Sequence, residues 1–481
     1  MTLPFDHLPA AEGGWRGLGA LRDLRRDYLG TLERHRVLGD LVRQRILREQ
    51  VLDVFDPELV RALMVDHADA LIRWERGPEV FAEGLGQCVL VTEGAIWQRQ
   101  RRMLMQAFTP RRVAGYVHHM VDATVRGLAP LADGEVAMDG LFSHLAMDVI
   151  SRTLFSAPIG DDTQAAARAV QVLSEMALRE MFWPATPPDW LPLPGKAAKR
   201  RSRRLIHGLI QAHIDARRQQ PAAGSTDLLH MLMTLRDEDG GGGLTDQEVF
   251  DQCVLSFQAG HETTATALLW WSWLMARHPA AQARAAEEVA GVLAGRAPGA
   301  DAVQALPWLT ATLKEAMRLY PPVPALMTRR LLRPITLGGV EVPARTMLRV
   351  TPWLLHRDPR CWPDEPDAFR PGRFMPSTPD QPVAHIPRGA YIPFGLGPRV
   401  CLGQHFAQLE MTVIAALLLQ RFELHTVDGR EAVPRMAVTL RPAGGLRLQL
   451  RRRPRRETAP TTPSPSSAMA QVPGSGTGAS V

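Results

Sequence analysis

The longest apolar helical pattern in the chain runs from Leu244 to Ala276, and it constrains the fold more than any other feature. Thr245, with Glu248 three positions later, predicts the start of the helix, because these side chains can cap each other's backbone N–H groups. A helix this apolar must cross a protein interior rather than lie on a surface. We therefore expect a mainly helical protein built around this segment, and 481 residues suffice for one.

The middle of this pattern carries the hexapeptide Ala-Gly-His-Glu-Thr-Thr at residues 259–264. A glycine and two threonines weaken the hydrogen bonding of a buried helix and favour a bulge that holds water. A carboxylate next to a hydroxyl, here Glu262 next to Thr263, can relay protons through such a bulge. A simple helix kink with solvated polar side chains is the alternative.

A second motif is the sequence Phe-Gly-Leu-Gly-Pro-Arg-Val-Cys-Leu-Gly at residues 394–403. Its glycines and proline predict a loop, and the apolar pattern from Phe406 to Leu417 predicts a helix directly after it. Cys401 therefore precedes free N–H groups at a helix N-terminus, where the dipole favours the thiolate, a metal ligand. The alternatives are a free buried cysteine and a zinc site with His405, which lacks a second ligand pair.

The spacing Phe-x-x-Gly-x-Arg-x-Cys-x-Gly, complete at Phe394, Gly397, Arg399, Cys401 and Gly403, resembles the haem-binding signature of the cytochrome P450 family. By this resemblance the cysteine is the axial ligand of the iron in haem b. The arginine would bind a haem propionate, and the glycines would let the backbone approach the macrocycle. The aromatic ring would shield the sulfur from water.

The hexapeptide at 259–264 resembles the oxygen-activation motif of the same family. The resemblance implies that Thr263 steadies dioxygen and water and that Glu262 connects the site to bulk protons. Both are therefore predicted catalytic residues.

Three more residues are predicted to bind haem. Trp97 and Arg101 are four apart and share one face of a predicted helix. In the resembled family a pair at this spacing holds a haem propionate. Arg329 is a second propionate candidate by the same resemblance.

A structural cluster is predicted from Glu315, Arg318 and Arg373. The first two lie three apart on a predicted helix and can pair. The third belongs to the run Phe369–Phe374, which resembles the family's Phe-x-Pro-x-Arg-Phe element. We assign this cluster to folding and to placement of the haem loop, because breaking it would strand charge in the interior.

The resemblance implies a mainly α fold with a small β lobe, the cytochrome P450 fold, with haem buried between the long helix and the cysteine loop. We expect residues 1–36 to be a lead-in without a membrane anchor and residues 37–452 to be the cytochrome P450 domain. Residues 453–481, rich in Pro, Ser and Gly, are expected to be a disordered tail.

Five local predictions complete the fold. We expect two strands in Val37–Phe55, an irregular loop in Arg76–Gly94 and a basic, solvated helix in Ala198–Arg218. We expect a hairpin in Val438–Leu450 whose tip reaches the pocket. The segment Trp183–Pro194, rich in proline and tryptophan, is either an ordinary turn or a lid over an apolar channel.

Composition restricts partners and location. No run of eighteen apolar residues and no signal-like N-terminus occurs, so we expect no membrane span. Four scattered cysteines fit a reducing cytosol, which predicts a cytoplasmic protein. The net charge of +6 comes largely from arginines at 451–456, and no aromatic–basic interleaving suggests nucleic-acid binding.

The implied function is a monooxygenase that inserts one oxygen atom of O2 into an apolar lipid, terpenoid or aromatic substrate. The expected substrate pocket includes Ala259, Val323, Ala325 and Leu326. Two alternatives stay open, which are a peroxide-driven peroxygenase or isomerase on the same fold and a non-enzymatic haem carrier or sensor.

Electrons are expected to come from NAD(P)H through a separate ferredoxin or flavodoxin and its reductase, because no flavin- or iron–sulfur-binding segment follows. We expect a monomer whose basic surface at Arg99, Arg102 and Arg112 attracts the acidic partner.

Overall fold

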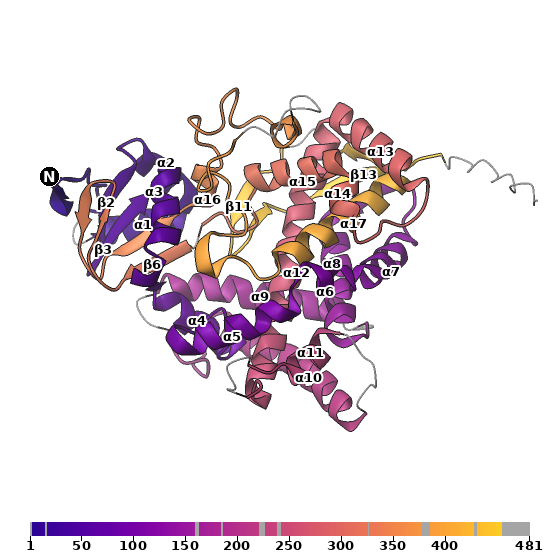
Figure 1. The fold of residues 1–481 in the computed structure, drawn as a ribbon, viewed down its shortest axis with the longest axis horizontal. Helices are drawn as coiled ribbons and strands as arrows, with labels where there is room; N and C mark the ends of the chain where they lie inside the picture. The colour runs from indigo at the N-terminus through magenta and orange to yellow at the C-terminus, as the bar shows by residue number, and fades with distance from the viewer. Residues whose placement is uncertain are drawn as a thin grey trace, which may run out of the picture.

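A computed structural model describes residues 2–14, 17–158, 163–183, 186–220, 227–237, 242–325, 327–376, 385–427 and 431–454. The protein has a small strand-rich lobe at one end and a large helical body at the other (Figure 1). The predicted fold class, mainly α with a small β lobe, is confirmed. Most of the predicted tail, from residue 455 onward, lies outside the described residues.

The described helices are α1 (Leu18–Arg26), α2 (Tyr28–Arg36), α3 (Pro57–Arg61), α4 (Arg76–Leu85), α5 (Gly94–Ala107), α6 (Pro110–Ala114), α7 (Val117–Leu128), α8 (Met138–Phe155), α9 (Thr163–Met181), α10 (Lys196–Gln219), α11 (Leu228–Thr234), α12 (Asp246–Arg277), α13 (Pro279–Leu293), α14 (Ala302–Ala305), α15 (Pro307–Leu319), α16 (Pro352–Leu355) and α17 (Gln404–Arg421). None of them is both long and apolar enough to cross a lipid bilayer.

The described strands are β1 (Leu3–Pro4), β2 (Leu41–Ile46), β3 (Glu49–Val54), β4 (Leu71–Arg73), β5 (Gly134–Ala137), β6 (Met327–Leu331), β7 (Ile335–Leu337), β8 (Val340–Val342), β9 (Met347–Val350), β10 (Phe422–Thr426), β11 (Pro434–Met436), β12 (Leu440–Pro442) and β13 (Arg447–Arg452). The largest sheet has the order β2-β3-β9-β6-β4, in which β3 and β9 run parallel and the other neighbours run antiparallel. This sheet forms the small lobe.

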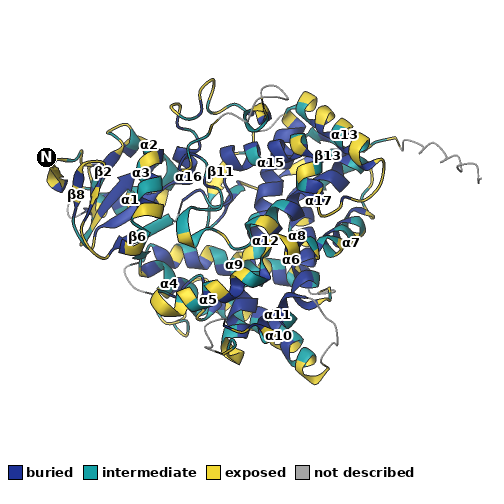
Figure 2. Cartoon of the chain, viewed as in Figure 1, coloured by how far each residue is buried: buried dark blue, intermediate teal, exposed yellow. Residues whose placement is uncertain are grey.

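The central helix α12 begins as predicted, at a capping box made by Thr245 and Glu248. Helix α8 packs along it, and α12 is buried over most of its length (Figure 2). Two adjacent tryptophans in the core hydrogen-bond their buried indole N–H groups. The indole N–H of Trp270 donates to Leu440 O at 2.6 Å, and that of Trp271 donates to the Thr312 hydroxyl at 2.9 Å. Both rings are therefore fully buried without an unpaired donor.

The predicted strands in Val37–Phe55 are confirmed as β2 and β3, which form a hairpin. The predicted loop in Arg76–Gly94 is wrong in its first half, because Arg76–Leu85 is helix α4. Val80 and Leu85 bury one face of this helix, and apolar burial outweighs the two glycines inside it.

The predicted hairpin in Val438–Leu450 is also wrong. Its first strand, β12, pairs with β11, whereas its second, β13, pairs with β10 and β5. Gly444 and Gly445, with φ of 80° and 81°, redirect the chain from one sheet to another. The tip of the actual β11–β12 hairpin, at Val438 and Thr439, does line the central cavity.

The predicted solvated helix in Ala198–Arg218 corresponds to α10, but two of its basic residues are buried. The ammonium of Lys196 lies 2.6 Å from Glu180 Oε1 and 2.8 Å from Asp189 Oδ1. Lys199 lies 2.7 Å from Glu180 Oε2. These ion pairs join α9, the segment before α10 and α10 itself, because buried charges require partners.

Candidate active site

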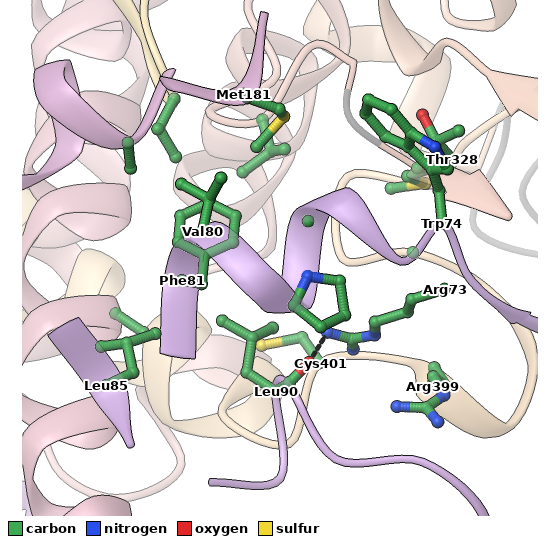
Figure 3. Close-up of a pocket in the computed structure, with 18 of the residues that line it drawn as sticks. Arg73, Trp74, Val80, Phe81, Leu85, Leu90, Met181, Thr328, Arg399 and Cys401 are labelled. Carbon is green, nitrogen blue, oxygen red and sulfur yellow. Dashed lines mark hydrogen bonds between the residues drawn. The ribbon is translucent and has the colours of Figure 1, made fainter. Parts of the chain in front are cut away.

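A cavity of about 1500 Å³ lies between α12, the cysteine loop, α4 and the small lobe. Side chains that include Val80, Phe81, Leu90 and Met181 make its wall largely apolar (Figure 3). Pockets for one small molecule usually have volumes of roughly 300–1,000 Å³. The cavity can therefore hold a large cofactor and an apolar substrate together.

Cys401 lies on the wall of this cavity, in the loop before α17. Its backbone N–H donates to Phe394 O at 2.9 Å, which closes the loop. Gly397 has a φ of 77°, and a Cβ there would lie 1.9 Å from Met64 O. Only glycine fits at this position, because a side chain would collide with the neighbouring backbone. Phe394 and Gly403 also line the cavity.

The helix N-terminus does not by itself make Cys401 a thiolate, contrary to the prediction from the sequence. Burial raises the pKa of the thiol, while the backbone N–H of Gly403 and the charge of Arg101 lower it by less. The thiol form is therefore favoured by the protein alone. A bound metal cation reverses this preference, because coordination deprotonates a thiol.

Among the arginines that line the same cavity are Arg73, Arg101, Arg329 and Arg399. Arg73 and Arg329 are direct neighbours across the β4–β6 pair, and Figure 3 shows Arg73 and Arg399 on the same side of the pocket. Burial lowers the pKa of Arg73 to about 9 and that of Arg329 to about 10, with further lowering by the charge of Arg399. Burial and the neighbouring positive charges thus outweigh the effect of the one nearby carboxylate, Glu93.

Glu93 is the carboxylate that touches this group. It accepts hydrogen bonds from the Arg399 guanidinium and, at 3.1 Å, from the backbone N–H of Arg73. Arg399 also donates to Thr92 O at 3.2 Å and lies over the Trp97 ring, 4.1 Å from its centroid. One carboxylate cannot balance four guanidinium groups, and Nε of Arg73 is buried without a partner. The cavity therefore presents surplus positive charge beside an apolar space.

These features fit haem. Its two propionates would meet the surplus arginines, its flat apolar ring would fit the largely apolar wall, and its iron would meet the sulfur of Cys401. Arg73 was not identified from the sequence, because nothing near it in the chain marks it as a ligand. Only the pairing of β4 with β6 brings Arg73 next to Arg329 in the cavity wall. Among the described residues, no group of three or more His, Cys, Asp and Glu side chains forms another metal site.

The acid–alcohol pair lies on α12 and lines the cavity. The predicted bulge is absent, because α12 is a continuous α-helix here and the Thr263 hydroxyl donates to Ala259 O at 2.9 Å. The Glu262 carboxylate accepts from the hydroxyls of Ser174 and, at 2.8 Å, Thr439. Arg441 lies 3.4 Å from it. Glu262 is thus tied to α9 and to the β11–β12 tip.

A second buried acid, Glu410 on α17, was not identified from the sequence. The Thr264 hydroxyl donates to it at 3.1 Å, and burial raises its pKa well above the usual range. Glu410 therefore links the oxygen-motif helix to the helix of the cysteine loop, in surroundings that disfavour its charged form.

The structure brings the predicted Glu315 cluster together. Nε and Nη2 of Arg318 each donate to Glu315 at 2.7 Å, and both side chains are fully buried. Arg373 Nε lies 3.6 Å from Glu315, and its other nitrogens donate to backbone carbonyls of residues 363–365.

Two of the four predicted pocket residues, Ala259 and Val323, line the cavity. Ala325 is fully buried behind the wall and does not line it, so that prediction is wrong. Leu326 lies outside the described residues.

The predicted basic docking surface needs correction as well. Arg99 lies 2.8 Å from Glu248, and Arg102 lies 2.8 Å from Asp237. These ion pairs neutralise two of its three charges, although Arg102 and Arg112 are both exposed.

A family model described as "Cytochrome P450" matches residues 24–449. The chain belongs to the cytochrome P450 family, whose members are haem-thiolate enzymes. It is an oxidoreductase of the monooxygenase class that uses haem, O2 and an organic substrate.

Its relatives include bacterial and plant enzymes. Cyclooctatin synthase of Streptomyces melanosporofaciens is 32% identical over 428 residues, which cover 88% of this chain and 90% of the relative. Cyclooctat-9-en-7-ol 5-monooxygenase of the same organism is 31% identical, with 84% and 85% coverage. The 11-oxo-beta-amyrin 30-oxidase of Glycyrrhiza uralensis is 32% identical, with 73% and 70% coverage.

Proposed function

We propose that this monooxygenase oxidises a C–H or C=C bond of an apolar lipid, terpenoid or aromatic compound, with electrons from NAD(P)H. The observation that carries the proposal is the shared cavity, in which Cys401 and four arginines border a large apolar space. The bacterial relative named cyclooctat-9-en-7-ol 5-monooxygenase supports a substrate with an apolar carbon skeleton. Haem held in this cavity supplies the reductive activation of O2.

The residues around the cofactor have separate proposed roles. Cys401 would hold the haem iron through its sulfur, and Phe394, Gly397 and Gly403 would shape the loop around that sulfur. Charge-assisted hydrogen bonds would hold the haem propionates, and the residues that would provide or support them are Arg73, Trp97, Arg101, Arg329 and Arg399.

Proton supply is assigned to α12. Thr263 orients water at the reacting site through its hydroxyl, and Glu262 accepts protons through Ser174 and Thr439 and passes them on. Ala259 and Val323 form part of the substrate wall. Glu315, Arg318 and Arg373 stabilise the fold next to the cysteine loop.

The electron donor is proposed to be a ferredoxin or flavodoxin with its reductase, and the enzyme is proposed to act as a monomer with residues 37–452 as its catalytic domain. Exposed Arg111 and Arg112 replace the larger docking surface expected from the sequence. The four cysteines are free, which supports a reducing cytoplasmic location.

The test is spectroscopic and catalytic. The haem-loaded protein, reduced under carbon monoxide, should show the far-red-displaced Soret peak of thiolate ligation, and Cys401→Ala should lose it. With a reductase system and ¹⁸O2, labelled oxygen should appear in the product. Retention of the peak in Cys401→Ala would overturn the ligand assignment, and turnover with peroxide alone would favour a peroxygenase.

A further inference from the structure

The central cavity extends to the small lobe, where its wall changes from apolar to basic. Arg45, Arg48, Arg330 and Arg345, together called the arginine rim, line this end. They also line an adjoining side pocket of about 360 Å³, together with Glu49 and Gln50. This volume falls within the range of roughly 300–1,000 Å³ that is usual for small-ligand sites.

Three elements of the lobe assemble the rim. The β2–β3 hairpin carries Arg45 and Arg48, β6 carries Arg330, and the turn before β9 carries Arg345. These elements are neighbours in the five-stranded sheet, so residues 300 positions apart in the chain, such as Arg45 and Arg345, border one pocket.

The carboxylates near the rim, Glu49 and Glu75, already form ion pairs with Arg330. Arg330 donates to both oxygens of Glu49, at 2.6 and 3.0 Å, and its Nε donates to Glu75 at 3.1 Å. Within the described part of the chain, no carboxylate pairs with the exposed side chains of Arg45, Arg48 or Arg345. The pocket therefore keeps a surplus of positive charge.

One feature argues against an ordinary solvated surface. Arg345 has a φ of 67°, in the left-handed region that non-glycine residues rarely adopt. Its carbonyl accepts from Arg330 Nη1 at 2.7 Å and its N–H donates to Leu331 O at 2.7 Å, so its backbone is fixed at the pocket. The neighbouring wall residues are part of the cavity that reaches Cys401.

We propose that the arginine rim binds the anionic end group of an elongated apolar substrate, whose other end lies at the reacting site. A carboxylate suits the rim best, because guanidinium groups bind its two oxygens in parallel. This inference rests on the proposed monooxygenase function and narrows its substrate to an apolar acid, of either fatty-acid or terpenoid skeleton.

The experiment compares matched acids and alcohols. Hexadecanoate with 1-hexadecanol, and dehydroabietate with dehydroabietinol, are titrated into the haem-loaded enzyme, and the Soret shift reports each Kd. For at least one skeleton the acid should bind about tenfold or more tightly than the alcohol, as expected for a charge-assisted contact. Its Kd should rise with salt, and the alcohol's should not.

Arg48→Glu should weaken binding of the acid by about tenfold or more and leave the alcohol's Kd unchanged. Arg126→Glu, on the exposed face of α7 and outside the cavity wall, makes the same change in net charge and should affect neither. Equal affinities for acid and alcohol in both skeletons, or no effect of Arg48→Glu, would overturn the proposal. So would the absence of any shift with all four probes, whereas the carbon monoxide spectrum tests the proposed function separately.

Discussion

Removal of Arg318 should test how strongly the interior depends on one buried ion pair. Its guanidinium makes two hydrogen bonds to Glu315 and donates to the carbonyls of His356, Pro366 and Ala368, at 2.8, 2.6 and 3.0 Å. Arg318→Ala would leave Glu315 ionised and buried, with Arg373 3.6 Å away as its nearest remaining cation. Stranding one charge of a buried pair costs about 3–5 kcal/mol.

The assay is urea unfolding of the haem-loaded enzyme, followed by tryptophan fluorescence. The single variants Glu315→Leu and Arg318→Met are measured beside the double variant Glu315→Leu/Arg318→Met. The double variant should lose less free energy of unfolding than the sum of the two single losses, by about 2 kcal/mol or more, because it leaves no buried charge without a partner. Arg61→Ala is the matched control. Arg61 also makes two hydrogen bonds to one carboxylate, Asp66, at 3.0 and 2.7 Å, but at the surface.

The control should leave the urea midpoint essentially unchanged, because an exposed pair is screened by water. The reasoning fails if Arg318→Ala unfolds at the same urea concentration as Arg61→Ala. It also fails if the effects of the two single changes simply add, because the pair would then have no coupling to lose.

Three further outcomes are expected. Arg73→Ala should speed haem transfer to apomyoglobin by about tenfold or more, since it removes a buried cation that we propose binds the propionates, and Arg126→Ala should not. Thr263→Ala should lower product formed per NAD(P)H consumed by about tenfold and release peroxide, and Thr263→Ser should restore coupling; unchanged coupling would remove the hydroxyl from the mechanism. Burial lowers the pKa of His356 to about 3. Between pH 6.5, its ordinary pKa, and pH 3, this residue takes up a proton only in the unfolded chain, so the protein becomes less stable as the pH is lowered. The free energy of unfolding should drop by about 2 kcal/mol from this residue between pH 7 and pH 5, and an equal pH slope in His356→Gln would contradict this.

Predictions from local patterns were reliable where the local signal and the tertiary demand agreed. Helix α12 was predicted with its capping box because apolar periodicity, length and cap all indicate the same structure. The loop at Arg76–Leu85 was mispredicted because its glycines suggest irregular backbone, while burial of Val80 and Leu85 stabilises a helix. Propensity is a weaker term than packing.

Strand pairing is the clearest case that local reasoning cannot reach. The strands β12 and β13 are joined by a glycine turn, yet each pairs with a different partner. Hydrogen-bonding patterns along a strand do not specify which distant strand completes them.

The amino-acid sequence alone predicted the chemistry of this protein, because a cysteine in a glycine-rich loop and an acid–alcohol pair in a long apolar helix are local patterns that few other functions need. Tertiary structure decided what surrounds that chemistry. It placed Arg73 beside Arg329, tied Glu262 to Ser174, and assembled the arginine rim from three separate strands and turns. The physical reason is that charge compensation depends on distance in space, which the order of residues along the chain does not contain.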